Sequence, residues 1–368
     1  MKKRFLGVLL SVAMVAAVLA GCGSSGAKET AAPAGSETEA ASEAASGETE
    51  AAGNTGDVIT VGFSQVGAES DWRTANTESM KSTFSEENGY ELIFDDAQQK
   101  QENQLTAIRN FIQQEVDYIV LAPVTESGWD TVLQEAKDAE IPVIIVDRMV
   151  DVSDDSLYTA WVGSNFKLEG QKACEWLKQY AAAKNMSEVN IVDIQGTIGA
   201  SAQIGRTEAL NEAVEANGWN LLAQQTGEFT QAKGQEVMES MLKQYDNINV
   251  VYCENDNEAF GAIEAIKAAG KTVGPDGDIL VMSFDTTKQG ITDTLSGDII
   301  VNTECNPLHG PRVEQIIKQL QAGETPEKQA YVEEGIYAHG SDVASVSIDG
   351  TDYEVTEVTQ DVVDARAY

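Results

Sequence analysis

Residues 59–73 read ITVGFSQVGAESDWR, in which an apolar run ends in a polar loop. The run at 59–64 is rich in β-branched and aromatic residues, a composition that favours a strand. The polar residues at 65–73 follow the carboxyl end of that strand, where open α/β sheets bind their ligands. This one unit therefore predicts both an α/β fold and the place of a site.

Similar apolar runs recur along the chain, separated by amphipathic stretches. Residues 102–114 carry Leu105, Ile108 and Ile112 at helical spacing, and residues 129–139 show the same periodicity. Such alternation predicts parallel sheets covered by helices on both faces. Ten runs exceed what one compact domain usually holds, so we expect two similar Rossmann-like α/β/α lobes. The expected strands lie at 59–64, 91–94, 117–121, 142–146, 159–162, 189–194, 221–225, 250–253, 279–284 and 299–302.

The first 22 residues have the pattern of an export signal. Basic residues at 2–4 precede an apolar run at 6–19 that is too short to favour a permanent membrane span. The exit Leu19-Ala20-Gly21-Cys22 resembles the lipobox of bacterial lipoproteins, although an ordinary signal followed by a chance cysteine is the alternative. We expect residues 1–21 to be removed and Cys22 to be lipidated, which anchors an extracytoplasmic protein to the outer face of the cell membrane.

Residues 22–56 are mostly Ala, Gly, Ser, Thr and Glu, a composition that predicts a disordered acidic tether. The whole chain has 24 basic and 60 acidic residues, and its net charge of −36 disfavours nucleic acid as a partner. Neither the other three cysteines nor the two histidines form a metal or catalytic motif, so we expect no metal and no cofactor. These residues are Cys174, Cys253, Cys305, His309 and His339.

Ordered segments across 57–337 resemble the ribose/galactose class of periplasmic sugar-binding proteins, and most closely its galactofuranose-binding members. The matching segments are 61–67, 69–70, 72–73, 96–104, 136–143, 147–148, 195–197, 234–240 and 261–263. The resemblance implies the type I solute-binding fold, in which two lobes joined by a three-crossover hinge close on a monosaccharide. It also implies a monomer without enzymatic activity that hands the sugar to an ABC permease.

The same resemblance implies the residues that bind the sugar. Sugar recognition requires flat apolar surface against C–H faces and paired polar groups for hydroxyls, because unpaired buried hydroxyls are costly. Trp72 is implied to supply the surface, Arg73 a fork of donors, and Asp147 with Arg148 a charged pair. The complete implied set is Glu69, Ser70, Trp72, Arg73, Asp147, Arg148, Arg206, Asn255, Asp285 and Glu304.

Each of these residues also has a structural alternative. A loop tryptophan can fill a core, the Asp147–Arg148 pair can be an ion pair at a strand end, and Arg206 can be a solvated surface residue. Asn255 and Asp285 can cap turns, as Asn and Asp commonly do. Glu304 is the least secure position, because its neighbours depart from the pattern of the family.

The resemblance places passages between the lobes at Ser164-Asn165, near Thr286 and near 304–307. We therefore expect one lobe at 57–163 plus 287–304 and the other at 164–286 plus 305–343. In the remaining C-terminal extension, 344–368, two alternating runs flank Asp349-Gly350, which predicts either a two-stranded extension or a partly ordered end.

Four rival functions follow from the sequence. Sugar-responsive repressors share the implied fold but begin with a helix-turn-helix, which this chain lacks at its start. A glycosidase using Asp147 and Asp285 as its carboxylates finds no supporting acid, base or nucleophile motif. A sensory partner of a chemoreceptor or histidine kinase and a binder of another pentose or hexose stay open, because the capturing chemistry is the same.

Overall fold

The computed structural model describes residues 58–368, and the expected signal peptide, the tether and Cys22 lie outside them. A six-stranded parallel sheet forms what we call lobe 1, with strand order β11-β5-β4-β3-β1-β2. Its strands are β1 (Ile59–Gln65), β2 (Tyr90–Asp96), β3 (Tyr118–Leu121), β4 (Val143–Val146), β5 (Ala160–Gly163) and β11 (Gln329–Tyr331). Its helices are α1 (Asp71–Thr83), α2 (Gln101–Gln113), α3 (Asp130–Asp138) and α9 (Gly310–Gln321), with 3-10 turns η1 (Glu86–Asn88) and η2 (Asp155–Leu157).

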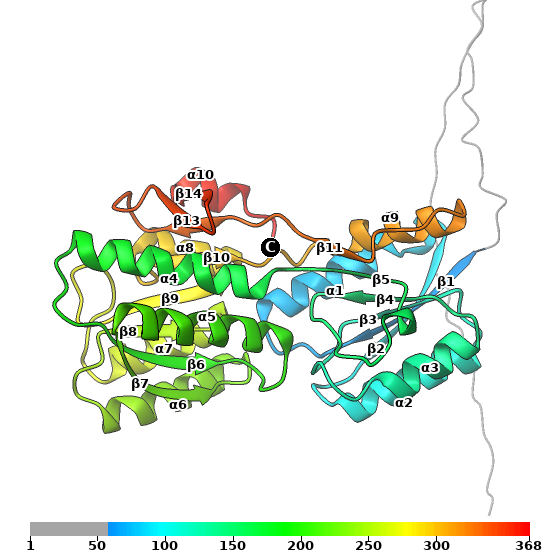
Figure 1. The fold of residues 1–368 in the computed structure, drawn as a ribbon, viewed down its shortest axis with the longest axis horizontal. Helices are drawn as coiled ribbons and strands as arrows, with labels where there is room; N and C mark the ends of the chain where they lie inside the picture. The colour runs from blue at the N-terminus through cyan, green and yellow to red at the C-terminus, as the bar shows by residue number, and fades with distance from the viewer. Residues whose placement is uncertain (1–57) are drawn as a thin grey trace, which may run out of the picture. The chain divides into compact units, whose positions relative to one another are not determined.

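A mixed eight-stranded sheet forms lobe 2, with strand order β13-β14-β12-β10-β9-β8-β6-β7. Its strands are β6 (Asn190–Gln195), β7 (Asn220–Thr226), β8 (Val250–Cys253), β9 (Leu280–Asp285), β10 (Val301–Glu304), β12 (Ile336–Ala338), β13 (Ser345–Ile348) and β14 (Thr351–Glu357). Its helices are α4 (Phe166–Ala183), α5 (Ser201–Asn217), α6 (Gln231–Gln244), α7 (Asp256–Ala268), α8 (Lys288–Ser296) and α10 (Gln360–Ala365) (Figure 1). None of the helices within 58–368 is long and apolar enough to cross a membrane.

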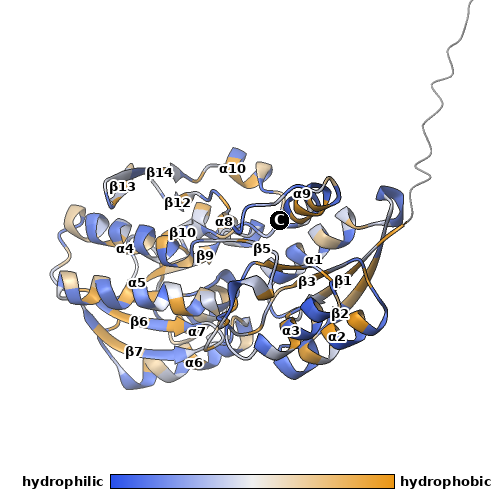
Figure 2. Ribbon diagram, turned by 45° about the vertical axis from the view of Figure 1, so that its right-hand side comes forward, coloured by the Kyte–Doolittle hydropathy of each residue, from blue (hydrophilic) through white to orange (hydrophobic). Residues whose placement is uncertain are grey.

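The central strands of lobe 1 are buried on both faces, as the sequence predicts for parallel strands. In β4, Val143 and Ile145 belong to a core that contains apolar residues of α2 and α3. Ile144 and Val146 point to the opposite face and share a core with α1 and α9. The helices carry both hydrophobic and hydrophilic residues, as Figure 2 shows for α2, α4 and α5. The predicted two-lobed α/β fold and all ten predicted strands are confirmed.

The predicted division of residues 287–343 between the lobes is wrong. β10 pairs in register with β9, which places 287–304 in lobe 2. After β10 the chain returns to lobe 1, where α9 packs beside α1 and β11 pairs with β5. The error has a simple cause: β11 and β12 have only three residues each, too few to give a periodic signal in the sequence.

Three segments therefore connect the lobes. We call them crossover 1 (residues 164–165, after β5), crossover 2 (305–309, after β10) and crossover 3 (332–335, after β11). Ser164 and Asn165 lie in crossover 1. Thr286 does not lie in a crossover, because β9 before it and α8 after it both belong to lobe 2.

The C-terminal extension is part of the sheet of lobe 2. β13 and β14 form an antiparallel hairpin whose turn residues, Asp349 and Gly350, both have positive φ angles, as two-residue hairpin turns of type I′ require. β14 also pairs in parallel with β12, and α10 packs on α8. The two-stranded alternative is thus the one that the structure contains.

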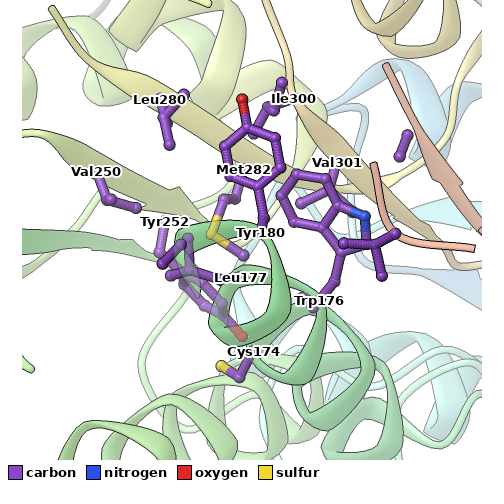
Figure 3. Packing of buried hydrophobic residues seen from close by; sticks show 14 of the residues in the cluster. Cys174, Trp176, Leu177, Tyr180, Val250, Tyr252, Leu280, Met282, Ile300 and Val301 are labelled. Atoms are coloured by element: carbon purple, nitrogen blue, oxygen red, sulfur yellow. The ribbon is translucent and has the colours of Figure 1, made fainter. Parts of the chain in front are cut away.

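Helix α4 anchors the largest core of lobe 2. Figure 3 shows Trp176, Leu177 and Tyr180 of α4 beside Met282 and Val301 of the sheet. Trp176 is 1 % exposed, and its ring stacks on Tyr180 with 4.7 Å between the ring centroids. This aromatic pair therefore fills the space between α4 and the strands.

We predict that Trp176→Ala lowers the free energy of unfolding by about 3–5 kcal/mol, because the substitution leaves a large cavity in a close-packed core. Trp219→Ala is the control, since Trp219 only packs against the margin of the same core. Its loss should be clearly smaller in a denaturant titration of both variants. Equal losses would contradict the packing described above.

Candidate functional site

A cavity lies between the two lobes, where the loops at the carboxyl ends of their strands face each other, and its space is about 290 Å³ with the part open to solvent included. Nine of the ten residues implied by the resemblance line it, and Glu304 does not. The lining residues are Glu69, Ser70, Trp72, Arg73, Asp147, Arg148, Phe166, Ala202, Arg206, Phe229, Asn255, Asp285 and Cys305. Both lobes thus contribute side chains to a single cavity.

The lobes are in direct contact around this cavity. The backbone N–H of Asp71 donates to Asn257 Oδ1 across 3.0 Å, and that of Met149 donates to Ser201 Oγ across 2.9 Å. Glu126 N–H donates to the carbonyl of Gly199 at 2.9 Å. Each of these bonds joins a loop of lobe 1 to lobe 2. The structure therefore represents the closed arrangement of the lobes.

Arg73 organises the wall that lobe 1 contributes. Its Nε donates to Glu69 at 3.0 Å, one terminal nitrogen donates to Gln65 at 3.2 Å, and the other donates to Asp147 at 2.8 Å. Coulombic attraction and hydrogen bonds from Asp147 and Glu69 outweigh the desolvation of the guanidinium and raise the pKa of Arg73. Arg73 is thus a fixed cation that holds both carboxylates in place.

Arg148 has few partners of its own. It is 3 % exposed and donates a hydrogen bond to the carbonyl of Val124 at 3.0 Å, while its ionic contacts to Glu69 and Asp147 are longer, at 3.7 and 3.9 Å. Burial and the charge of Arg73 lower the pKa of Arg148 to about 10, so it remains charged at neutral pH. Glu69 Oε2 is also buried and has no donor. Two residues that line the same cavity therefore keep unused donors and an unused acceptor.

Arg206 organises the wall of lobe 2 in a similar way. It is 2 % exposed, which excludes the alternative of a solvated surface residue. Its Nε donates to Glu169 at 2.8 Å, a terminal nitrogen lies 3.4 Å from Asp285, and another donates to the carbonyl of Glu254. Burial raises the pKa of Asp285 well above its usual range despite this cation. Asp285 can thus offer a ligand either an acceptor or a proton.

Asp147 and Asp285 occupy equivalent positions in the two lobes. Asp147 directly follows β4 and Asp285 ends β9, and their φ angles are +62° and +98°. Positive φ angles are uncommon outside glycine, and Asp tolerates them better than most residues. Each strand end thus turns sharply and presents a carboxylate to the cavity.

Ser70 and Asn255 both cap helices. Ser70 Oγ accepts from the N–H of Arg73 at the start of α1, and Asn255 Oδ1 accepts from the N–H of Glu258 at the start of α7. Asn255 Nδ2 also donates to the carbonyl of Phe229 at 3.1 Å. The capping alternative is therefore correct for Asn255, which lines the cavity with one amide hydrogen still available.

Three aromatic side chains supply the apolar surface. Trp72 donates its indole N–H to the carbonyl of Cys305 at 2.7 Å and shares a buried cluster with Phe166 and Phe229. The sequence interpretation missed both phenylalanines, although Phe229 follows the carboxyl end of β7 and so fits the rule that located the other residues. A Cβ at Gly196 would come within 1.9 Å of the Phe229 ring, so glycine makes room for it. Phe166 opens α4 just after crossover 1, a position to which that rule does not apply.

Glu304 belongs to the hinge rather than to the cavity. Its Oε2 accepts from the N–H of Gly335 at 2.9 Å in crossover 3. Its Oε1 accepts from Arg366 at 2.7 Å and from the hydroxyl of Tyr368 at 2.9 Å. Protein donors thus occupy both oxygens of Glu304, which does not line the cavity with the other implied residues.

One group of described residues has the composition of a metal site. The ligand atoms of Glu169, Cys305 and Glu334 lie within 4.8 Å of one another. Arg206 is already paired with Glu169, Lys172 lies nearby, and burial raises the pKa of Cys305 well above its usual range. A thiolate and a divalent cation are thus both disfavoured here. The cysteines 174, 253 and 305 are buried and unpaired, as small packed residues are expected to be.

Comparison with known proteins agrees with this arrangement. Residues 61–303 match the model of a periplasmic binding protein domain. The chain belongs to this family. It is 43 % identical to the galactofuranose-binding protein of Escherichia coli (strain K12), over 76 % of this chain and 87 % of that protein. Members of the family bind and transport solutes, so the chain is a binding protein and not an enzyme.

Two solved structures resemble the chain closely. A protein from Mycobacterium smegmatis in complex with β-D-fucofuranose is 44 % identical, with a TM-score of 0.73, over 76 % of this chain and 91 % of that one. The periplasmic component of an arabinose ABC transporter from Shewanella sp. ANA-3, bound to α- and β-L-arabinofuranose, is 41 % identical, with a TM-score of 0.71. That alignment covers 76 % of this chain and 92 % of the Shewanella protein.

We predict that Arg73→Ala destabilises the ligand-free protein far more than Arg148→Ala does. Removing Arg73 leaves two buried carboxylates without their main partner, which lowers the free energy of unfolding by about 3–5 kcal/mol. Removing Arg148 loses one hydrogen bond, at about 1 kcal/mol, and also relieves repulsion between the two guanidinium groups. Denaturant unfolding of both variants measures the difference, and equal losses would show that the two cations carry similar structural roles.

Proposed function

We propose that this chain is the extracytoplasmic solute-binding lipoprotein of an ABC sugar importer. In this role it captures a monosaccharide, with galactofuranose as the preferred ligand, by closure of its two lobes and delivers the sugar to the permease. The observation that carries the proposal is the cavity between the lobes, which aromatic residues line together with charged residues whose hydrogen bonding is incomplete.

The polar chemistry of the cavity suits a polyhydroxylated ligand. Arg148 has unused N–H donors, and Glu69 Oε2 lacks a donor. Adjacent sugar hydroxyls both donate and accept, so one ligand can form the missing charge-assisted hydrogen bonds with both Arg148 and Glu69. Asp147 in lobe 1 adds a further acceptor, and Arg206 in lobe 2 adds a further donor. Trp72, Phe166 and Phe229 provide apolar surface for the C–H faces of the sugar.

Support for a five-membered sugar ring comes from the relatives. The Escherichia coli protein is named for galactofuranose, and the two solved structures hold fucofuranose and arabinofuranose. The alternative is a binder of another pentose or hexose, since a single changed hydroxyl partner alters such preferences.

Lobe closure would be the signal that the membrane partner reads. Contacts across the cleft, such as Asp71 to Asn257, contribute part of the free energy of closure. The ligand supplies the rest by binding the closed state more tightly than the open state. A monomer suffices for this mechanism. A sensory partner that reads the same closed form is the second alternative, and the genes that neighbour the coding sequence would separate it from import.

We predict that galactofuranose binds with a dissociation constant of about 1 μM or below, roughly −8 kcal/mol, in a calorimetric titration. Galactopyranose, arabinose, ribose and xylose should bind more weakly. Asp147→Asn should weaken binding by about 2 kcal/mol or more, about thirtyfold, because it removes a buried charged acceptor. Asp138→Asn, an exposed substitution on α3, is the control and should bind normally. Binding of none of these sugars by the folded protein would refute the proposal.

We also predict that Cys22→Ser prevents acylation and releases the protein from the cell membrane, because one thiol carries the anchor. Mass spectrometry of the mature N-terminus measures the acyl groups, and fractionation measures the release. Retention of the Cys22→Ser protein on the membrane would show that another segment anchors it.

A further inference from the structure

Glu334 lies in crossover 3, and its carboxyl connects all three crossovers. Its Oε1 accepts a hydrogen bond from Ser164 Oγ in crossover 1 at 2.6 Å. The same oxygen accepts from the N–H of Asn306 in crossover 2 at 2.7 Å. The three segments that join the lobes are therefore held together at a single oxygen atom.

A second carboxyl group, that of Glu169 on α4, lies beside Glu334. Glu169 is 1 % exposed, and its Oε2 accepts from Arg206 at 2.8 Å. Its Oε1 is buried and has no protein donor. A buried carboxylate oxygen without a donor is costly, so the arrangement calls for a proton between the two acids.

We propose that Glu334 holds a proton in the closed state and with it donates a hydrogen bond to Glu169 Oε1, which makes Glu334 a positioning residue for sugar binding. The resulting chain of contacts runs from the crossovers through Glu334, Glu169 and Arg206 to Asp285 in the cavity. The inference rests on the proposed function, because it assigns the regulation of the proposed sugar site.

The charges around the pair favour this placement of the proton. Burial raises the pKa of both acids, and the charge of Glu169 raises that of Glu334 further. Arg206 and Lys172 lower the pKa of Glu169, so Glu169 is the ionised partner. Other titratable groups that face the pair are Glu304, Asp285 and Cys305.

Proton binding by Glu334 and sugar binding are coupled, because both depend on whether the lobes are open or closed. Glu334 is half-buried in the closed state. Rotation about the crossovers separates Ser164, Asn306 and Glu334 and admits more water, which returns the pKa of Glu334 toward its ordinary value. The closed state thus holds the proton more tightly than the open state. The proton therefore favours closure at pH values below the raised pKa of Glu334, and this contribution is lost as the pH rises through that pKa. Because sugar binding closes the lobes, it is accompanied by uptake of a proton.

The test is calorimetric titration of the protein with galactofuranose, or with whichever sugar of the panel binds best, from about pH 6 to about pH 9. Two buffers of different ionisation enthalpy report the protons taken up. We expect proton uptake and an affinity that falls with rising pH, at a limiting slope of about tenfold per pH unit for one linked proton.

Glu334→Gln is the decisive variant. Its amide oxygen can accept from Ser164 and Asn306 while its N–H donates to Glu169, so it reproduces the hydrogen bonds without a titrating proton. Affinity at the acid end should stay within about threefold of the wild type, and the pH dependence should vanish. Glu334→Ala should bind weakly at every pH, and Glu333→Gln, an exposed neighbour, should behave as the wild type.

A wild-type affinity that does not depend on pH would overturn the inference, as would a Glu334→Gln variant that keeps the wild-type dependence. Absence of sugar binding at every pH would instead refute the proposed function. In that event the infrared difference spectrum between the ligand-free wild type and Glu334→Gln tests the proton directly. Loss of a protonated carboxylic acid band supports the inference, and loss of a carboxylate band overturns it.

Discussion

Each lobe holds a buried guanidinium between two carboxylates, and the closed structure depends on this balance. Arg73 lies between Glu69 and Asp147 in lobe 1, and Arg206 lies between Glu169 and Asp285 in lobe 2. Charges excluded from water are tolerated only when they are paired and hydrogen-bonded. The two triads make a charged cleft compatible with closure, and they leave Arg148 as the cation that protein partners satisfy least.

The same local geometry produces the triad in each lobe. A parallel strand must leave the sheet at its carboxyl end, and an aspartate that tolerates a positive φ angle allows the turn there while it lines the cleft. An arginine near the start of a helix then reaches that carboxylate in each lobe, from α1 and from α5. Rigid walls prepared in this way need little reorganisation on binding, which favours affinity and selectivity.

Much of this architecture could be predicted from the sequence because it depends on strong local signals. Apolar runs revealed the strands, and the strand-end rule with the family resemblance located Arg73, Asp147 and Arg206. The sequence interpretation missed Phe166 because it opens a helix after a crossover. It did not find the hinge contacts of Glu304, because their partners, Gly335, Arg366 and Tyr368, are distant in sequence. The division of the lobes after residue 286 failed for a related reason, since three-residue strands carry no periodicity.

The indole of Trp72 connects the first helix of lobe 1 to the carbonyl of Cys305 in crossover 2 and borders the cavity. The chain has four other tryptophans, at 129, 161, 176 and 219, and none of them lines that cavity. A change in the separation of the lobes therefore alters the surroundings of Trp72 directly, whereas the other four tryptophans do not border the cavity. The protein carries an internal optical reporter of its own closure, which allows ligand capture to be followed in real time without an attached dye.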